Sequence, residues 1–197
     1  MARALLGYDL SICGLSELDE HAQRVSHVIS ILDPDYPDPE EFARYRPHRR
    51  TTFRFHDCVE SHHMPSAPAY RDVEALIAAG EAHSAPEVEH LLIHCHAGIS
   101  RSTATAAIFM AQRNPGREDE AFAALDLVRP RAWPNSLIIR YADEILGRGG
   151  ALIEAMRAHH ARIVHTHPEL AALIRFHGRA HEVPNVDAIR RGDGAED

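Results

Sequence analysis

The segment from His94 to Ser102 constrains this chain more than any other part of its sequence. It reads His-Cys-His-Ala-Gly-Ile-Ser-Arg-Ser and lies between a short apolar stretch, residues 91–93, and an alanine-rich run typical of a helix. A loop between a strand and a helix can offer main-chain N–H groups and the positive end of the helix dipole to an anion. Arg101 adds a guanidinium that can hold two oxygens at once. The segment therefore predicts a cradle for a phosphate-like dianion.

Cys95 stands at the start of this loop. The positive field that would hold a dianion also favours a thiolate, which is a nucleophile at neutral pH. Gly98 permits backbone geometry and a close approach that a Cβ would hinder. A cysteine that only packs in the core would leave Gly98, Arg101 and the loop serines unexplained. The pattern thus favours a reactive cysteine.

These residues resemble the signature H-C-x-x-G-x-x-R-[ST] of the cysteine-dependent protein tyrosine phosphatase superfamily. Ala97, Ser100 and Ser102 make the loop most similar to the dual-specificity branch and its bacterial relatives. The resemblance covers roughly residues 8–148 and implies an α/β fold. It also implies that His94 orders the loop through hydrogen bonds. The implied phosphate-binding residues are His96, Ala97, Gly98, Ile99, Ser100 and Arg101.

The resemblance further implies hydrolysis through a phosphocysteine intermediate, with no metal and no cofactor. Cys95 would attack phosphorus while Arg101 and the loop amides stabilise the equatorial oxygens. Ser102 would hydrogen-bond the sulfur and help it leave in the second step. The alternative for Ser102 is an ordinary serine in the first turn of a helix.

Protonation of the leaving oxygen calls for a carboxyl group on a loop near the phosphate. In the family that the chain resembles, an aspartate upstream of the cysteine and just after a strand has this role. Asp57 occupies that place after residues 53–56, although a turn or capping carboxylate is the alternative. Glu60 and Asp72 are reserve candidates for the acid. Histidines that could supply a proton, against the family pattern, are His56, His62 and His63.

A second stretch, residues 128–135, resembles the R-P-x-x-x-P-N segment downstream of the loop in dual-specificity-type phosphatases. Asn135 either positions the hydrolytic water or caps the helix that begins near Ser136. Arg129 and Arg131 either flank the site electrostatically or brace the loop through salt bridges.

Strand-like and helix-like segments alternate along the chain, which predicts an α/β fold with a central, mostly parallel sheet flanked by helices. The site is then expected at the carboxyl ends of the strands. The proline-containing segment 33–50 should be loop with one helical turn. Expected strands cover residues 10–14, 25–32, 51–57 and 90–94, and expected helices cover 16–21, 69–82, 103–113, 118–128, 137–146, 151–165 and 168–178.

The chain divides by character into a catalytic domain, residues 1–150, and a C-terminal helical extension, residues 151–197, expected to pack on the same domain. From about residue 185 the sequence is polar and is expected to fray. The extension either completes the helical layer, or holds a substrate or a second subunit.

Composition narrows the class of protein. The 197 residues carry a formal net charge of −8 and contain no lysine, so we expect no nucleic-acid partner. No run approaches the roughly 20 apolar residues of a membrane span, and no signal peptide is evident.

An odd number of cysteines predicts a reducing compartment, hence a cytoplasmic protein. Cys13 and Cys58 are either small buried residues or disulfide partners of oxidised Cys95. The sixteen histidines show no zinc-ligand order, so no metal site is expected.

We expect the substrate to be a phosphorylated protein, or a small phosphate ester, with phosphotyrosine favoured. Phosphoserine and phosphothreonine would follow if the pocket is shallow. The absence of lysine from the loop disfavours, without excluding, an inositol phosphate. Phosphate, sulfate, vanadate or tungstate should bind the loop. Two alternatives stay open. The chain could be a pseudophosphatase that only binds phosphorylated partners. It could also be a related enzyme that acts on another oxyanion, such as an arsenate reductase or a sulfur transferase.

Overall fold

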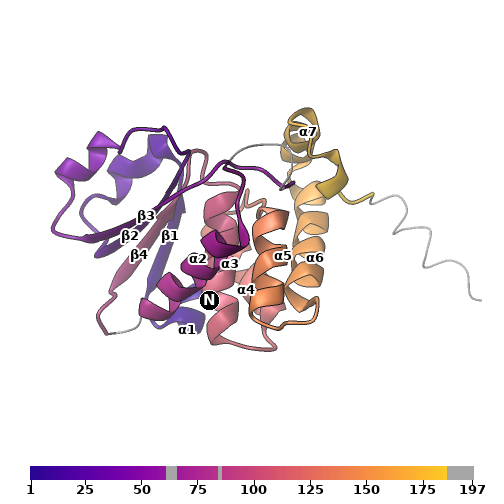
Figure 1. The fold of residues 1–197 in the computed structure, drawn as a ribbon, viewed down its shortest axis with the longest axis horizontal. Coiled ribbons are helices and arrows are strands. Elements are labelled where there is room, and N and C mark those ends of the chain that lie inside the picture. The colour runs from indigo at the N-terminus through magenta and orange to yellow at the C-terminus, as the bar shows by residue number, and fades with distance from the viewer. Residues whose placement is uncertain (61–65, 84–85, 186–197) are drawn as a thin grey trace, which may run out of the picture.

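A parallel four-stranded sheet forms the centre of the computed structural model, which describes residues 1–60, 66–83 and 86–185 (Figure 1). The strand order is β1-β4-β2-β3, so each of the inner strands β4 and β2 pairs with a neighbouring strand on both sides. All six residues of β2 are buried, as its β-branched, apolar sequence predicts. The strands are β1 (Asp9–Cys13), β2 (His27–Leu32), β3 (Arg49–Arg54) and β4 (His90–His94).

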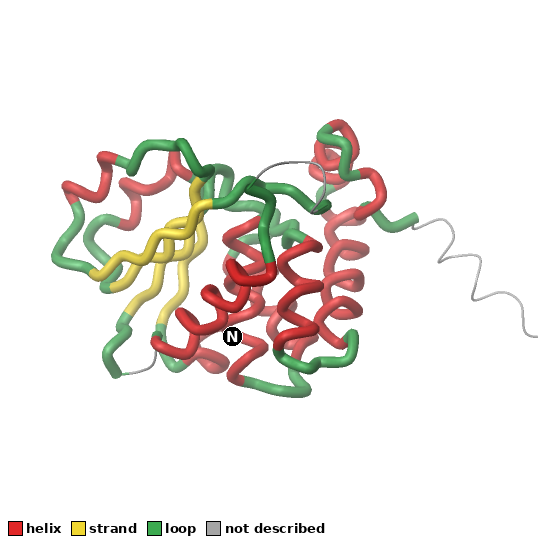
Figure 2. The backbone as a smooth tube through the Cα atoms, viewed as in Figure 1, coloured by secondary structure: helices red, strands yellow, loops and turns green. Residues whose placement is uncertain are grey.

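The helices gather mainly on one face of the sheet (Figures 1 and 2). Helix α3 lies at the centre of this layer against β1 and β4, and the alanines of its buried face allow the close approach. Contacts with α3 are made by α1, α2, α4 and α5, while α6 packs on α4 and α5. The helices are α1 (Ala2–Leu6), α2 (Tyr70–Ala82), α3 (Arg101–Arg113), α4 (Glu118–Val128), α5 (Ser136–Ile145), α6 (Ala151–Thr166) and α7 (Pro168–Phe176).

The opposite face of the sheet carries a thinner cover of two 3₁₀ helices, η1 (Leu15–His21) and η2 (Glu40–Arg44). Side chains of a strand alternate between the two faces. Accordingly Ile29 and Ile31 enter the large core beneath the helices, while Val28 enters a smaller core on the η1 side. The predicted α/β fold with a central parallel sheet between helical layers is confirmed.

Local details differ from the sequence-based expectations. The helix expected over 16–21 is a 3₁₀ helix, in which the N–H of Gly14 bonds the Glu17 carboxylate at 2.7 Å. Helix α3 begins at Arg101, two residues before the expected start, because the loop feeds straight into its first turn. Helix α1 and the 3₁₀ helix η3 (Ala180–Glu182) were not predicted, since elements this short carry no periodic signal.

The segment after α5 lies against the helical layer. Trp133, in the loop after α4, is fully buried and forms a third small core with Ile163, Leu170 and Ile174 from α6 and α7. The His160 ring stacks on Trp133 at 4.0 Å between centroids. Helices α6 and α7 are thereby tied to the loop that leads into α5. Within the described ranges, no helix combines the length and apolar character needed to cross a bilayer.

Candidate active site at the carboxyl end of the sheet

The loop between β4 and α3 uses its carbonyl groups to bind the rest of the protein. The carbonyl of His96 accepts from the N–H of Leu15 at 2.9 Å, and that of Ile99 accepts from the N–H of Trp133 at 2.8 Å. In the described part of the chain, no acceptor pairs with the main-chain N–H groups of residues 96–100. A loop with paired carbonyls and unpaired amides is a ready site for an anion.

Gly98 lets this loop lie directly on the end of β1. Its φ of +66° is in the left-handed region, and a Cβ there would lie 2.4 Å from the main-chain carbon of Cys13. Any larger residue at position 98 would push the loop off the strand.

Arg129 braces the loop from behind. Its guanidinium donates to the carbonyls of Gly98 at 3.0 Å and Ala97 at 3.1 Å, and binds both oxygens of Glu17 at 2.8 Å. The hydrogen bonds from Arg129 hold the pKa of Glu17 below its ordinary value. Of the two roles considered for Arg129, the geometry favours bracing. Arg131 instead lies at the surface, 4.0 Å from Glu169.

Cys95 follows β4 directly and is buried, with its Sγ 3.2 Å from the Oγ of Ser102. The structure thus brings together the sulfur and the hydroxyl that the signature pairs. His94, also fully buried, lies 2.7 Å through Nε2 from the Oγ of Ser30 on β2. Burial lowers the pKa of His94 to about 4, so its ring is neutral at physiological pH and links two strands beneath the loop.

The Arg101 guanidinium is buried and is fixed along one edge. Its Nη1 donates to Asp33 at 2.7 Å and to the carbonyl of Phe55 at 2.6 Å. Its Nε, by contrast, is buried without a hydrogen-bond partner among the described residues. An unsatisfied buried donor is costly, and a bound anion would satisfy it. The side chain is therefore prepared for an oxyanion.

Asp33 is a site residue that the sequence reasoning did not single out. It follows β2 at the same edge of the sheet at which Cys95 follows β4 and Asp57 comes after β3. Besides Arg101, its carboxylate faces His56 and His96, each at 3.7 Å. Its position after a buried strand was the available signal, since the carboxyl ends of parallel strands meet at one edge.

Asp57 lies beside the loop, and among the described residues the donors reach only its Oδ1. Its Oδ1 accepts hydrogen bonds from the Oγ of Ser100 at 2.7 Å and from the Nδ2 of Asn135 at 2.8 Å. The Oδ1 of Asn135 accepts from the N–H of Ile138 at 3.1 Å and so caps α5. Asn135 therefore both caps the helix and contacts the expected acid.

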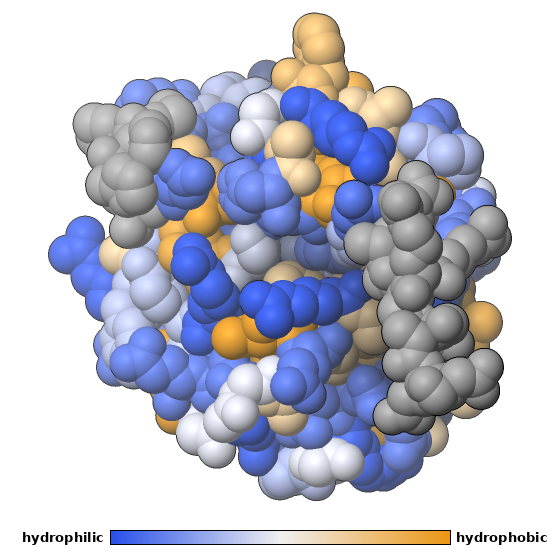
Figure 3. All heavy atoms as spheres, turned by 90° about the vertical axis from the view of Figure 1, so that its right-hand side faces the viewer, coloured by the Kyte–Doolittle hydropathy of each residue, from blue (hydrophilic) through white to orange (hydrophobic). Residues whose placement is uncertain are grey.

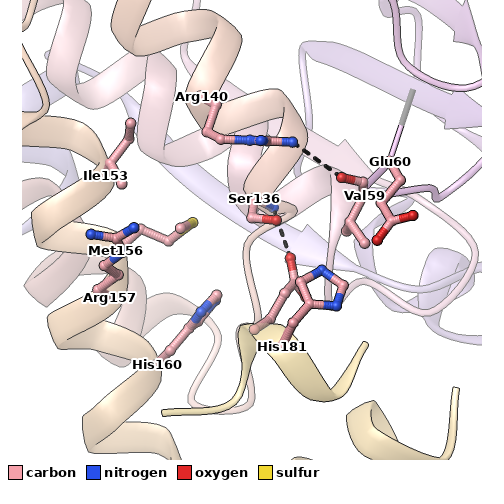
Figure 4. Close-up of a pocket in the computed structure, with 10 residues that line it drawn as sticks. Val59, Glu60, Ser136, Arg140, Ile153, Met156, Arg157, His160 and His181 are labelled. Atoms are coloured by element: carbon pink, nitrogen blue, oxygen red, sulfur yellow. Dashed lines mark hydrogen bonds between the residues drawn. The ribbon is translucent and has the colours of Figure 1, made fainter. Parts of the chain in front are cut away.

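The reserve candidates for the acid lie elsewhere. Asp72 accepts a hydrogen bond of 2.9 Å from the N–H of Ala69 and caps α2. Glu60 lines a different pocket, where Arg140 donates to the carbonyl of Val59 at 3.2 Å (Figure 4). His62 and His63 lie outside the described residues.

Cys13, Cys58 and Cys95, all within the described ranges, form no disulfide. Burial raises the pKa of Cys13 to about 12 and also raises that of Cys58, so both groups favour the thiol form. Over residues 1–60, 66–83 and 86–185, no group of three or more His, Cys, Asp or Glu side chains is placed to hold a metal ion.

Comparison with known proteins agrees with this geometry, although no family model matches the chain. The human protein phosphatase Slingshot homolog 3 is 27% identical over 148 residues, which cover 68% of this chain and 18% of the relative. The chain thus spans about a fifth of the length of that curated relative.

Solved structures give the fold. Human DUSP28 matches with a TM-score of 0.50 and 19% identity, covering 71% of this chain and 94% of that one. The Yvh1 phosphatase domain from Chaetomium thermophilum matches with a TM-score of 0.51 and 18% identity, covering 73% and 93%. The human tyrosine phosphatase-like serine/threonine/tyrosine-interacting protein gives the same four values. This chain therefore has the fold of these phosphatase structures, in agreement with the resemblance carried by residues 94–102.

Proposed function

We propose that this protein is a phosphatase that hydrolyses phosphate monoesters through a phosphocysteine intermediate. The observation that carries the proposal is one loop whose amides, residues 96–100, find no acceptor among the described residues, with Cys95 and Arg101 at its two ends and Asp57 bonded to its Ser100. Each group has the chemistry that one part of the reaction needs: a nucleophile, a fixed cation and a carboxyl group.

In the first step, the Sγ of Cys95 forms a bond to phosphorus as the bond to the leaving oxygen breaks. Asp57 gives its proton to that oxygen, so an alcohol or phenol departs. The Nε of Arg101 and the loop amides hold the equatorial oxygens, whose charge they stabilise in the transition state. Arg101 has little freedom to turn away, because Asp33 and Phe55 hold its other edge.

In the second step, a water attacks phosphorus and Asp57, now a carboxylate, accepts the proton. The S–P bond breaks, the thiolate of Cys95 is regenerated and phosphate leaves. The Oγ of Ser102, 3.2 Å from the sulfur, donates a hydrogen bond that stabilises the departing thiolate. Asp57 thus donates the proton in the first step and accepts one from water in the second.

The substrate class follows from the pocket beside Asp57. This pocket, of about 350 Å³, is lined by Asp57, by loop residues that include Ile99 and Ser100, and by residues of α7. Helix α7 contributes the apolar side chains of Leu170, Leu173 and Ile174. Figure 3 views the molecule from the side that carries α6 and α7, where small apolar patches lie between strongly hydrophilic side chains. An apolar wall next to an anion cradle favours an aryl phosphate, and we propose phosphotyrosine as the preferred substrate.

The test is hydrolysis of p-nitrophenyl phosphate by the wild type, Cys95→Ser and Asp57→Asn, each with and without EDTA. We expect chelation to have no effect, Cys95→Ser to be inactive and Asp57→Asn to lose about 10²–10⁴-fold in rate. Cys58→Ser is the matched control, a thiol outside the mechanism, and should keep wild-type activity. An inactive wild type that still binds phosphotyrosine peptides would replace the proposal with a binding module.

A further inference from the structure

One charged side chain of the C-terminal extension, that of Arg179, lies against Ser100 and Asp57 in the candidate active site. Arg179 lies between α7 and η3 and is buried, with 9% of its surface exposed. Its Nη1 donates a hydrogen bond of 3.0 Å to the Oγ of Ser100 and lies 3.6 Å from the Oδ1 of Asp57. The Ser100 hydroxyl therefore accepts from Arg179 and donates to Asp57 at 2.7 Å.

Two hydrogen-bond donors, Ser100 and Asn135, and the nearby cation of Arg179 thus converge on one oxygen of Asp57. The Oδ1 atom faces Ser100, Asn135 and Arg179, whereas no described residue donates to Oδ2. This arrangement leaves Oδ2 as the oxygen of Asp57 that is open to carry the transferred proton. The donors also stabilise the carboxylate left after the proton has moved, because each hydrogen bond to a charged acceptor strengthens.

Arg179 is itself held in place by Glu182. The Nε of Arg179 donates to the Oε2 of Glu182 at 2.7 Å, and the same oxygen accepts from the Nε1 of Trp133 at 3.1 Å. The Oε1 of Glu182 accepts from the N–H of Ser136 at 3.2 Å, and Figure 4 marks this bond as the dashed line at Ser136. Both members of this ion pair are buried.

Stability alone does not account for this arrangement. Ion pairs at such depth contribute little net stability on average, because desolvation offsets the attraction. The same elements already pack through Trp133, Leu170 and Ile174, which need no charge. The buried ion pair of Arg179 and Glu182 is explained if it orients the carboxyl group of Asp57.

We infer that Arg179 is a positioning residue for the proton transfer by Asp57, so that the C-terminal extension is a working part of the active site. This inference rests on the proposed phosphatase function. Arg179 acts through Ser100 and Asp57 and is not itself placed against the reacting atoms.

The test compares kcat/KM for two esters, phenyl phosphate and p-nitrophenyl phosphate. Phenol is a poor leaving group and needs the proton, whereas p-nitrophenol leaves more readily without it. Arg179→Gln should lose on the order of tenfold or more on phenyl phosphate and about twofold on p-nitrophenyl phosphate. Arg179→Lys, which retains a donor, should recover part of the loss.

Two controls separate positioning from folding. Arg175→Gln removes an exposed arginine of α7 and should behave as the wild type on both esters. The double variant Arg179→Met, Glu182→Gln leaves no unpaired buried charge, and its thermal unfolding and vanadate-protected alkylation of Cys95 report whether the site is folded. It should show the same selective loss on phenyl phosphate.

Equal losses on the two esters, or unchanged activity on both, would overturn the positioning role while leaving the phosphatase intact. A wild type that hydrolyses neither ester would overturn both proposals.

Discussion

The side-chain amide of Asn135 donates a hydrogen bond of 2.8 Å to Asp57, while its oxygen caps helix α5 through the N–H of Ile138 at 3.1 Å. One buried residue thus ties the position of the acid to the start of a helix. The two roles are separable, because serine is also a good N-cap but has no amide to reach Asp57.

Asn135→Ala should therefore lose about 1 kcal/mol of stability together with activity, whereas Asn135→Ser should lose activity alone. Urea unfolding measures the first effect and kcat/KM on phenyl phosphate the second. If both variants kept wild-type activity, the contact with Asp57 would have no role in the reaction.

Glu17→Gln tests the brace behind the loop. The Arg129 hydrogen bonds lower the pKa of Glu17, so its stabilising contribution is present above the unfolded pKa and is lost as pH falls through the folded pKa. The variant should be about 1 kcal/mol less stable at neutral pH and should lose less stability on acidification. Urea unfolding across pH checks this. A variant whose stability changes with acid as steeply as the wild type would contradict the brace.

His94→Gln tests the neutral imidazole under the loop. The folded pKa of about 4 lies below the unfolded value, so the unfolded chain binds the proton first. Stability from His94 is full above about pH 6.5 and declines toward pH 4, by about 3 kcal/mol in all, given the pKa of about 4.

The unfolding free energy of His94→Gln should consequently fall less steeply between these two pH values. His165→Gln, at an exposed position of α6, is the control and should keep the wild-type slope. Identical slopes for all three proteins would show that His94 titrates normally.

Leu173→Ala tests the apolar wall contributed by α7. Leu173 is 42% exposed, so its truncation should not disturb folding. The expected result is a KM for phosphotyrosine peptides raised about fivefold, with kcat unchanged, because the lost contact is equal in ground state and transition state. Leu127→Ala, at a 67% exposed leucine of α4, is the matched control. An unchanged KM would remove α7 from the substrate pocket.

The loop and the sheet were predictable because their signals are local. Residues 94–102 match a signature with fixed spacing, and strands such as β2 are rich in apolar, β-branched residues. The fold and the positions of Cys95 and Arg101 therefore follow from short stretches of sequence. Asp57 was expected only through the family resemblance; the structure places it 2.7 Å from Ser100 of the loop, and its role as the acid stays a prediction.

Long-range partners carry no such signal. Glu17 supports the loop through Arg129, and Arg179 contacts it at Ser100. These two residues come from opposite ends of the chain, and nothing near either in the sequence indicates the contact. Whether the extension only completes the helical layer, or also holds a substrate or a second subunit, likewise could not be read from its residues, because the answer depends on the path of the chain after α7.

The central claim is that Cys95 carries the phosphoryl group. The most direct measurement is mass spectrometry of peptides from protein quenched in acid during turnover of p-nitrophenyl phosphate, with Asp57→Asn included because it should slow breakdown of the intermediate. We predict phosphate on the peptide that contains Cys95, in the wild type and at higher occupancy in Asp57→Asn, and none in Cys95→Ser. Phosphate on a different residue, or turnover by Cys95→Ser, would contradict the mechanism.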